Sequence, residues 1–144
     1  MIIDVHTHLN NYHEDKVSSI TESLDLLSNT MKDNNVDYAL ILSSYKVNEH
    51  RPSTKQVVEA VKGYKNLGVV AGISYLHYNY KDVIEISKYL AEGYIKALKF
   101  YPGYEPFYPN NIRFKLVYEM AIEYDVPVMF NSVDTYAPNG KVKY

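Results

Sequence analysis

Gly68-Val69-Val70-Ala71-Gly72-Ile73 is the stretch of sequence that decides the fold. It is apolar almost throughout, whereas a strand with one face in water alternates apolar and polar residues. A run of this kind is typical of a strand buried on both faces of a parallel sheet. Four similar runs occupy residues 2–5, 38–42, 95–100 and 126–130. The runs recur roughly every 25 to 35 residues, which is the length of one β/α unit.

Segments with helical periodicity separate these five runs. Apolar residues fall on one helical face in each segment: Ile20, Leu24, Leu27 and Met31; then Val57, Val58 and Val61; then Val83, Ile86 and Leu90; then Phe114, Val117 and Ala121. Ser19 with Glu22, and Ser53 with Gln56, have the spacing of capping boxes and predict where two helices begin. The resulting β-α-β-α-β-α-β-α-β order requires right-handed crossovers and parallel strands, which leaves a doubly wound open sheet or a barrel.

Composition narrows the classes of function. The formal net charge of −2 provides no basic field for a phosphate backbone, so we expect a small-molecule partner and no nucleic acid. The chain has no cysteine, so a metal ion would have to be held by His, Asp, Glu or a modified Lys. No signal peptide and no run of about 18 apolar residues is present, which predicts a cytoplasmic protein without a membrane partner.

The first apolar run leads into Asp4-x-His6-x-His8. Residues two apart on a strand project from the same face, so Asp4, His6 and His8 are expected to lie together. In parallel α/β folds, function sits at the carboxyl ends of the strands, where this motif lies. Two neutral imidazoles in that position can bind one divalent ion. The sequence therefore predicts a metal site with His6 and His8 as ligands.

Three stretches resemble the amidohydrolase superfamily, in particular its amidohydrolase-related branch, which includes decarboxylases of aromatic and unsaturated carboxylic acids. Ile2-Ile3-Asp4-Val5-His6-Thr7-His8-Leu9 resembles the first-strand metal motif of the family. Ile95-Lys96-Ala97-Leu98-Lys99-Phe100-Tyr101-Pro102 and Val126-Pro127-Val128-Met129-Phe130-Asn131-Ser132 resemble its fourth and fifth strands. The resemblance implies an α/β fold that is a partial (β/α)8 TIM-like barrel, with about five parallel strands and four helices. Residues 1–144 are then a single amidohydrolase-like domain, which we expect to be incomplete at the C-terminus.

The same resemblance implies a metal-dependent hydrolase, or a decarboxylase, acting on a small carboxylated or amide-like substrate. The implied cofactor is a divalent metal, zinc in the first place, with manganese or iron as alternatives. His6 and His8 are ligands in this interpretation, and Asp4 supports them from the second shell. Asn131 stands where the family has a metal-binding His, and its amide oxygen is a weaker ligand for zinc.

Lys99 and Tyr101 are expected to bind substrate. Some amidohydrolases carry a carbamylated lysine near the position of Lys99, but an ammonium group that meets an anionic substrate is the interpretation we favour. The family's sixth-strand His and eighth-strand Asp, the latter its usual general base, have no counterpart in the sequence. We therefore assign no catalytic residue and expect weak activity or none. Residues 134–144 predict a polar loop and the start of a further element.

Several alternatives stay open at this stage. A metal-dependent phosphoesterase also begins with such a strand, but its later His-Gly and Asp-His pairs are absent. The chain could instead be an inactive truncated remnant or an association module, since edge strands one and five would favour self-association. The loop of residues 101–109, rich in proline and aromatic residues, could form a pocket rim or pack over the fourth helix. His50, Arg51 and His77 lie in other strand-to-helix loops and are solvated or face an anionic substrate.

Overall fold

Five parallel strands form one sheet in the computed structural model, which describes residues 1–10 and 16–131. The strands are β1 (Ile3–Thr7), β2 (Tyr38–Leu42), β3 (Leu67–Ile73), β4 (Ile95–Phe100) and β5 (Val128–Phe130), and they lie side by side in sequence order. The sequence-based expectation of five strands in a parallel sheet is confirmed. The expectation for residues 134–144 lies outside the described residues.

Four helices join the strands, and two of them begin where the sequence predicts. They are α1 (Ile20–Asp33), α2 (Thr54–Val61), α3 (Tyr80–Ala91) and α4 (Lys115–Glu123), with a short 3-10 helix (Ile112–Phe114) before α4. Ser19 and Ser53 both form the predicted capping boxes. In each box the serine side chain accepts a backbone N–H, and the Glu or Gln three residues later accepts the backbone N–H of the serine.

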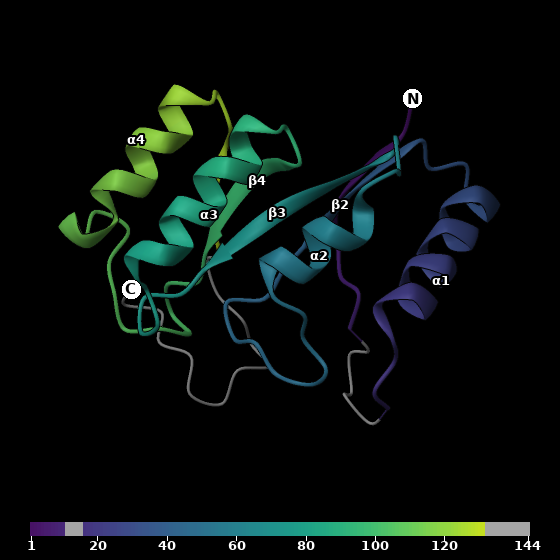
Figure 1. Ribbon diagram of the computed structural model, residues 1–144, viewed down its shortest axis with the longest axis horizontal. Coiled ribbons are helices and arrows are strands. Elements are labelled where there is room, and N and C mark those ends of the chain that lie inside the picture. The colour runs from purple at the N-terminus through teal and green to yellow at the C-terminus, as the bar shows by residue number, and fades with distance from the viewer. Residues whose placement is uncertain (11–15, 132–144) are drawn as a thin grey trace.

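The strand order decides between the two candidate folds. In a doubly wound sheet the order in which strands are added reverses at one point, so helices cover both faces of the sheet. Here each strand adds beside the previous one, so right-handed crossovers put every helix on the same face of the sheet. Figure 1 shows the four helices arranged along the sheet, from α1 to α4. The fold is therefore a half-barrel, a partial (β/α)8 TIM-like architecture.

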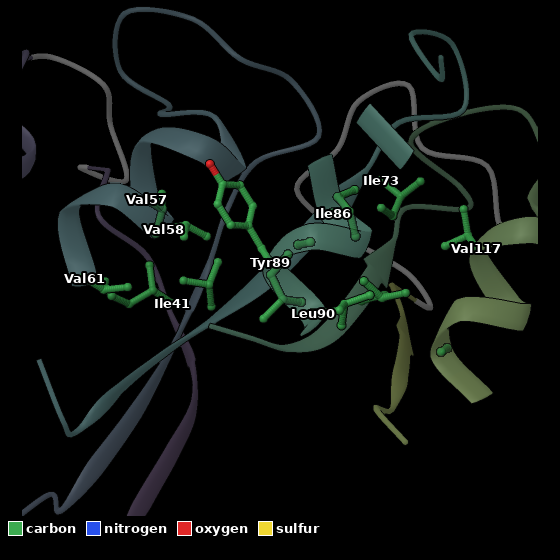
Figure 2. Close-up of a cluster of buried hydrophobic side chains, with 14 of the residues drawn as sticks. Ile41, Val57, Val58, Val61, Ile73, Ile86, Tyr89, Leu90 and Val117 are labelled. Carbon is green, nitrogen blue, oxygen red and sulfur yellow. The ribbon is translucent and has the colours of Figure 1, made fainter. Parts of the chain in front are cut away.

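The main core lies between the sheet and the helices. Figure 2 shows its centre, where Val57, Val58 and Val61 of α2 and Ile86, Tyr89 and Leu90 of α3 meet side chains of the strands. A smaller cluster of Leu42, Val70 and Ala97 covers the opposite face. Val69, Val70 and Ala71 of β3 are 0% exposed, so this strand is buried on both faces as its apolar run predicts.

Three strands have boundaries that differ from the sequence-based runs, and the largest differences are in the first and the fifth. The first strand continues past Val5 to Thr7, so it contains His6 but ends just before His8. The fifth strand begins at Val128, whereas the apolar run begins at Val126. Pro127 has no N–H to donate to the ladder, which explains the later start. In the described residues, none of the helices combines the length and apolar character that a membrane crossing requires.

Candidate functional site

The carboxyl ends of the strands bring together residues from β1 and β4. His6 lies on β1 and Lys99 on β4, with two strands between them, yet Nε2 of His6 and Nζ of Lys99 are 3.3 Å apart. In a flat sheet these strands would be separated by three spacings, or about 14 Å. The contact therefore reflects the curvature of the half-barrel. We call the cluster of His6, His8, Lys99 and Tyr101 the mouth site.

The two histidines of the mouth site are positioned as a pair. Their ring centroids are 5.3 Å apart, with the planes inclined by 56°. The pairing of β1 with β2 is irregular between Asp4 and Thr7, next to His6, and irregularities of this kind often re-aim side chains beside a site. The structure thus brings together the two residues that the sequence predicts as metal ligands, although His8 lies one residue beyond the strand.

The environment of both rings favours the neutral imidazole. Desolvation lowers the pKa of His6, the Lys99 charge adds to this effect, and Asp4 opposes it. The pKa of His8 falls to about 4, mainly through desolvation and then through the neighbouring charges of His6 and Lys99. His8 still exposes surface to solvent, so surrounding protein atoms rather than full enclosure desolvate it. Neutral imidazole is the form that binds metal ions.

Lys99 is the buried cation of the mouth site. It is 5% exposed, and desolvation lowers its pKa. Its ammonium group lies 5.3 Å from the centre of the Tyr101 ring, a cation–π arrangement. Tyr101 in turn lies against Tyr45, with ring centroids 4.3 Å apart, and donates a hydrogen bond to the Ser43 carbonyl at 3.4 Å. The predicted substrate-binding residues Lys99 and Tyr101 therefore adjoin the predicted ligands.

Asp4 and Asn131 occupy the periphery of this arrangement. The Asp4 carboxylate accepts the backbone N–H of His6 at 3.0 Å, so it fixes the backbone beside the ligand. The backbone N–H of Asn131 donates to the Phe100 carbonyl at 3.0 Å, which places Asn131 at the carboxyl end of β5 next to β4. Within residues 1–10 and 16–131, no group of three or more His, Asp or Glu side chains is arranged to hold a metal ion.

Arg51 also influences the mouth site, from the loop before α2. Its positive charge lowers the pKa of His8 and opposes the increase of the Tyr101 pKa that burial causes. The sequence identifies Arg51 only as one of several loop cations. Tyr45 gives even less signal, because it is one of 16 tyrosines and belongs to no motif.

A buried carboxylate that sequence reasoning missed links the loops beside the mouth site. Glu105 is 2% exposed and accepts hydrogen bonds from the Ser74 hydroxyl at 2.7 Å and from the backbone N–H groups of Tyr75 at 2.7 Å and Leu76 at 3.1 Å. In the same loop, Phe107 is 1% exposed and packs against Phe114. This part of the 101–109 loop is therefore packing structure and not an open rim.

A close backbone approach fixes the loop before α2. The buried Ser43 hydroxyl accepts the N–H of Gly72 at 3.0 Å and lies 2.7 Å from the Thr54 hydroxyl. A Cβ atom at Gly72 would come within 2.4 Å of the Ser43 carbonyl oxygen. Only glycine leaves the space for this contact, so Gly72 sets the path of the chain from Ser43 to Tyr45.

Comparisons with known proteins support the fold. No protein-family model and no curated protein matches the sequence. The structure is similar to that of an uncharacterized TIM-barrel protein from Bordetella bronchiseptica, with a TM-score of 0.66 and 18% identity. The match covers 99% of this chain and 58% of that protein, so the chain spans somewhat more than half the length of its structural neighbour. The chain therefore has a partial TIM-barrel fold.

Proposed function

We propose that the chain is part of a metal-dependent hydrolase, or decarboxylase, of the amidohydrolase superfamily that acts on a small carboxylated or amide-like substrate. The observation that carries this proposal is the convergence of His6, His8 and Lys99 at the carboxyl ends of β1 and β4. That edge is where TIM-barrel enzymes hold their active sites. The first-strand motif Asp4-x-His6-x-His8 supplies the resemblance to the superfamily.

The chemistry of the donors fits a divalent ion. Both imidazoles have lowered pKa values and are neutral near pH 7, so their nitrogen lone pairs are available. Asn131 is proposed as a weak third ligand and Asp4 as the group that holds the backbone of His6. Zinc suits two imidazoles best, with manganese or iron as alternatives. When bound, such an ion polarises a substrate oxygen or lowers the pKa of water toward neutrality.

Lys99 and Tyr101 are proposed to bind and orient the substrate. The Lys99 ammonium group is buried, so its attraction for a substrate carboxylate is screened less than it would be on the surface. Lys99 also contacts Nε2 of His6, which is one of the two ring nitrogens available to a metal ion. If the contact between Lys99 and His6 breaks, that nitrogen becomes free to bind a metal ion. The Lys99 ammonium group can then turn toward a substrate. Metal binding and substrate binding are thus coupled through one side chain.

Elemental analysis tests this proposal. The purified chain is incubated with zinc chloride, desalted and measured for bound zinc. We expect close to one ion per chain in the wild type and almost none in a variant with His6→Ala and His8→Ala. His77→Ala is the matched control, because His77 lies in an exposed loop outside the mouth site and should leave the zinc content unchanged. Equal zinc in the wild type and the double variant would refute the proposal.

A second proposal, self-association, rests on the exposed apolar residues of β1. Ile3 is 48% exposed and Val5 is 52% exposed, and β1 pairs with only one neighbour in the described residues. A strand edge with apolar side chains is a template for pairing with another chain. We expect light scattering to show a mass that rises with protein concentration, and Val5→Lys to reduce this rise. A monomer at every concentration would contradict the proposal.

A further inference from the structure

Strand β1 contains one residue more than regular pairing with β2 allows. Asp4 of β1 pairs with Ala39 of β2. Three residues later, Thr7 pairs with Ile41, which is only two residues after Ala39. A single extra residue on one of two paired strands is a β-bulge. Because side chains alternate between the two faces of a sheet, the extra residue moves every later side chain of β1 to the other face.

The bulge decides which face of the sheet receives the two histidines. Without it, the register at Asp4 would continue and place His6 beside Ile41. Ile41 is 0% exposed and belongs to the main core between the sheet and the helices (Figure 2). Paired residues of neighbouring strands point to the same side of the sheet. In a regular ladder His6 would therefore face the helices.

With the bulge, the histidines lie on the opposite face of the sheet. Ala97 belongs to the smaller apolar cluster on that face. Lys99 lies two residues after Ala97 on β4, so it points to the same side. The 3.3 Å contact between Nε2 of His6 and Nζ of Lys99 places the His6 ring on this face as well, and the His8 ring lies next to it. The mouth site therefore depends on the change of register.

Two side chains of β1 bond backbone groups at the bulge. The Thr7 hydroxyl donates to the Leu40 carbonyl of β2 at 2.9 Å, in a part-buried position. The Asp4 carboxylate accepts the backbone N–H of His6 at 3.0 Å. A bulge disrupts the ladder locally, so the backbone groups beside it need other partners. Thr7 supplies one across the two strands, and Asp4 supplies one within β1.

We propose that Thr7 is a positioning residue of the mouth site: its hydroxyl holds the bulge that turns His6 and His8 toward Lys99. Thr7 pairs with a residue of the main core, so its side chain faces away from the mouth site and acts through the backbone. This inference rests on the proposed function, because the position of the two histidines matters for a metal site. It adds a residue that lies between the two ligands and touches neither metal nor substrate.

NMR of the metal-free chain tests the position of the histidines. A nuclear Overhauser cross-peak between the His6 ring and the methylene group next to the Lys99 ammonium group reports their contact. We expect this cross-peak in the wild type and in Thr7→Ser, which keeps the hydroxyl. It should be lost in Thr7→Val, which keeps the shape of the side chain without the hydroxyl. An unchanged cross-peak in Thr7→Val would overturn the proposal.

Thr30→Val is the matched control. The Thr30 hydroxyl donates to the Leu26 carbonyl at 2.8 Å, so this variant loses the same kind of bond in α1. The cross-peak should persist in Thr30→Val, and urea unfolding should show that both valine variants are folded. Loss of the cross-peak in this control as well would attribute the effect to general destabilisation and overturn the proposal.

A second variant removes the other bond at the bulge. Asp4→Ala should also weaken the cross-peak between His6 and Lys99, because the backbone N–H of His6 loses its acceptor. This variant decides the question if Thr7→Val does not fold. A cross-peak of wild-type intensity in Asp4→Ala would then overturn the role of the bulge.

Zinc titration separates this inference from the proposed function. Groups that orient metal ligands typically contribute about 10- to 100-fold to metal affinity. Thr7→Val should therefore bind zinc at least about tenfold more weakly than the wild type, and Thr7→Ser should bind it as the wild type does. Equal affinity of Thr7→Val and the wild type would overturn the inference. Absence of zinc binding by the wild type would refute the proposed function, and the cross-peak would still decide the role of Thr7.

Discussion

Strands β3 and β1 are both rich in apolar residues, but the structure uses them differently. The β3 side chains of Val69, Val70 and Ala71 are fully buried, on the helix side of the sheet and on its opposite face alike. Ile3 and Val5 of β1 remain about half exposed, although β1 carries both His6 and the irregular pairing beside it. We infer that β3 contributes more to the stability of the half-barrel than β1 does. The role of β1 is to position His6 at the mouth site, with less packing around the strand.

Truncation of matched isoleucines tests this contrast most strongly. Ile73→Ala in β3 should lower the free energy of unfolding by about 2–5 kcal/mol, because it leaves a cavity at a side chain that is 3% exposed. Ile3→Ala in β1 should cost less than about 1 kcal/mol, since that side chain is 48% exposed. Urea denaturation measures both values. Equal losses would mean that β1 is as deeply packed as β3.

The next largest effect concerns the loops that follow β3 and β4. Glu105→Ala should destabilise the chain by about 2–3 kcal/mol, because one hydroxyl and two backbone N–H groups in a part-buried loop lose a charged acceptor. Glu119→Ala is the control, because its exposed ion pair with Lys115 at 3.6 Å should contribute less than about 0.5 kcal/mol. If thermal or urea unfolding showed similar losses for the two variants, Glu105 would not be the link between these loops.

A smaller effect connects β1 with β4 through the mouth site. Lys99→Met keeps an unbranched side chain that is one atom shorter, and removes a positive charge 3.3 Å from Nε2 of His6. Zinc affinity should rise about tenfold, equivalent to about 1.4 kcal/mol, because the cation no longer competes for the ring. Isothermal titration gives the affinity, with Lys96→Met as the exposed control on the same strand. A decrease in affinity would show that Lys99 helps to hold the ion.

The smallest expected effect is the pH dependence that His8 contributes. Its pKa is about 4 in the folded chain and near 6.5 when unfolded. Between these values the unfolded state binds more protons, so stability is lost as the pH falls from about 6.5 toward 4. His8→Gln removes this contribution. The fall in Tm between pH 6.5 and pH 4 should therefore be about 2–4 °C smaller in the variant than in the wild type. An equal fall in both proteins would contradict the lowered pKa of His8.

Local sequence patterns predicted the scaffold well. The run from Gly68 to Ile73 indicated a doubly buried strand, and the serines at positions 19 and 53 indicated helix starts, because these features depend on neighbouring residues. The sequence also predicted that His6 lies on the first strand, although the strand ends before His8.

Contacts between distant residues were not predictable in the same way. Lys99 meets His6 across 93 positions, and only the curvature of the sheet brings them together. Glu105 binds a loop about 30 positions away, and no periodicity or motif marks that contact. The change of register in β1 likewise arises from its pairing with β2, which no short stretch of sequence specifies.

The central claim is that His6 and His8 form one metal-binding pair, and their ring nitrogens report on it directly. Proton–nitrogen NMR of the imidazoles, recorded at pH 7 during a zinc titration, should show two neutral rings whose signals change together and stop changing at one equivalent of zinc. The signals of His50 and His77 should stay in place. Unchanged signals from His6 and His8, or changes confined to one of the two rings, would contradict the claim.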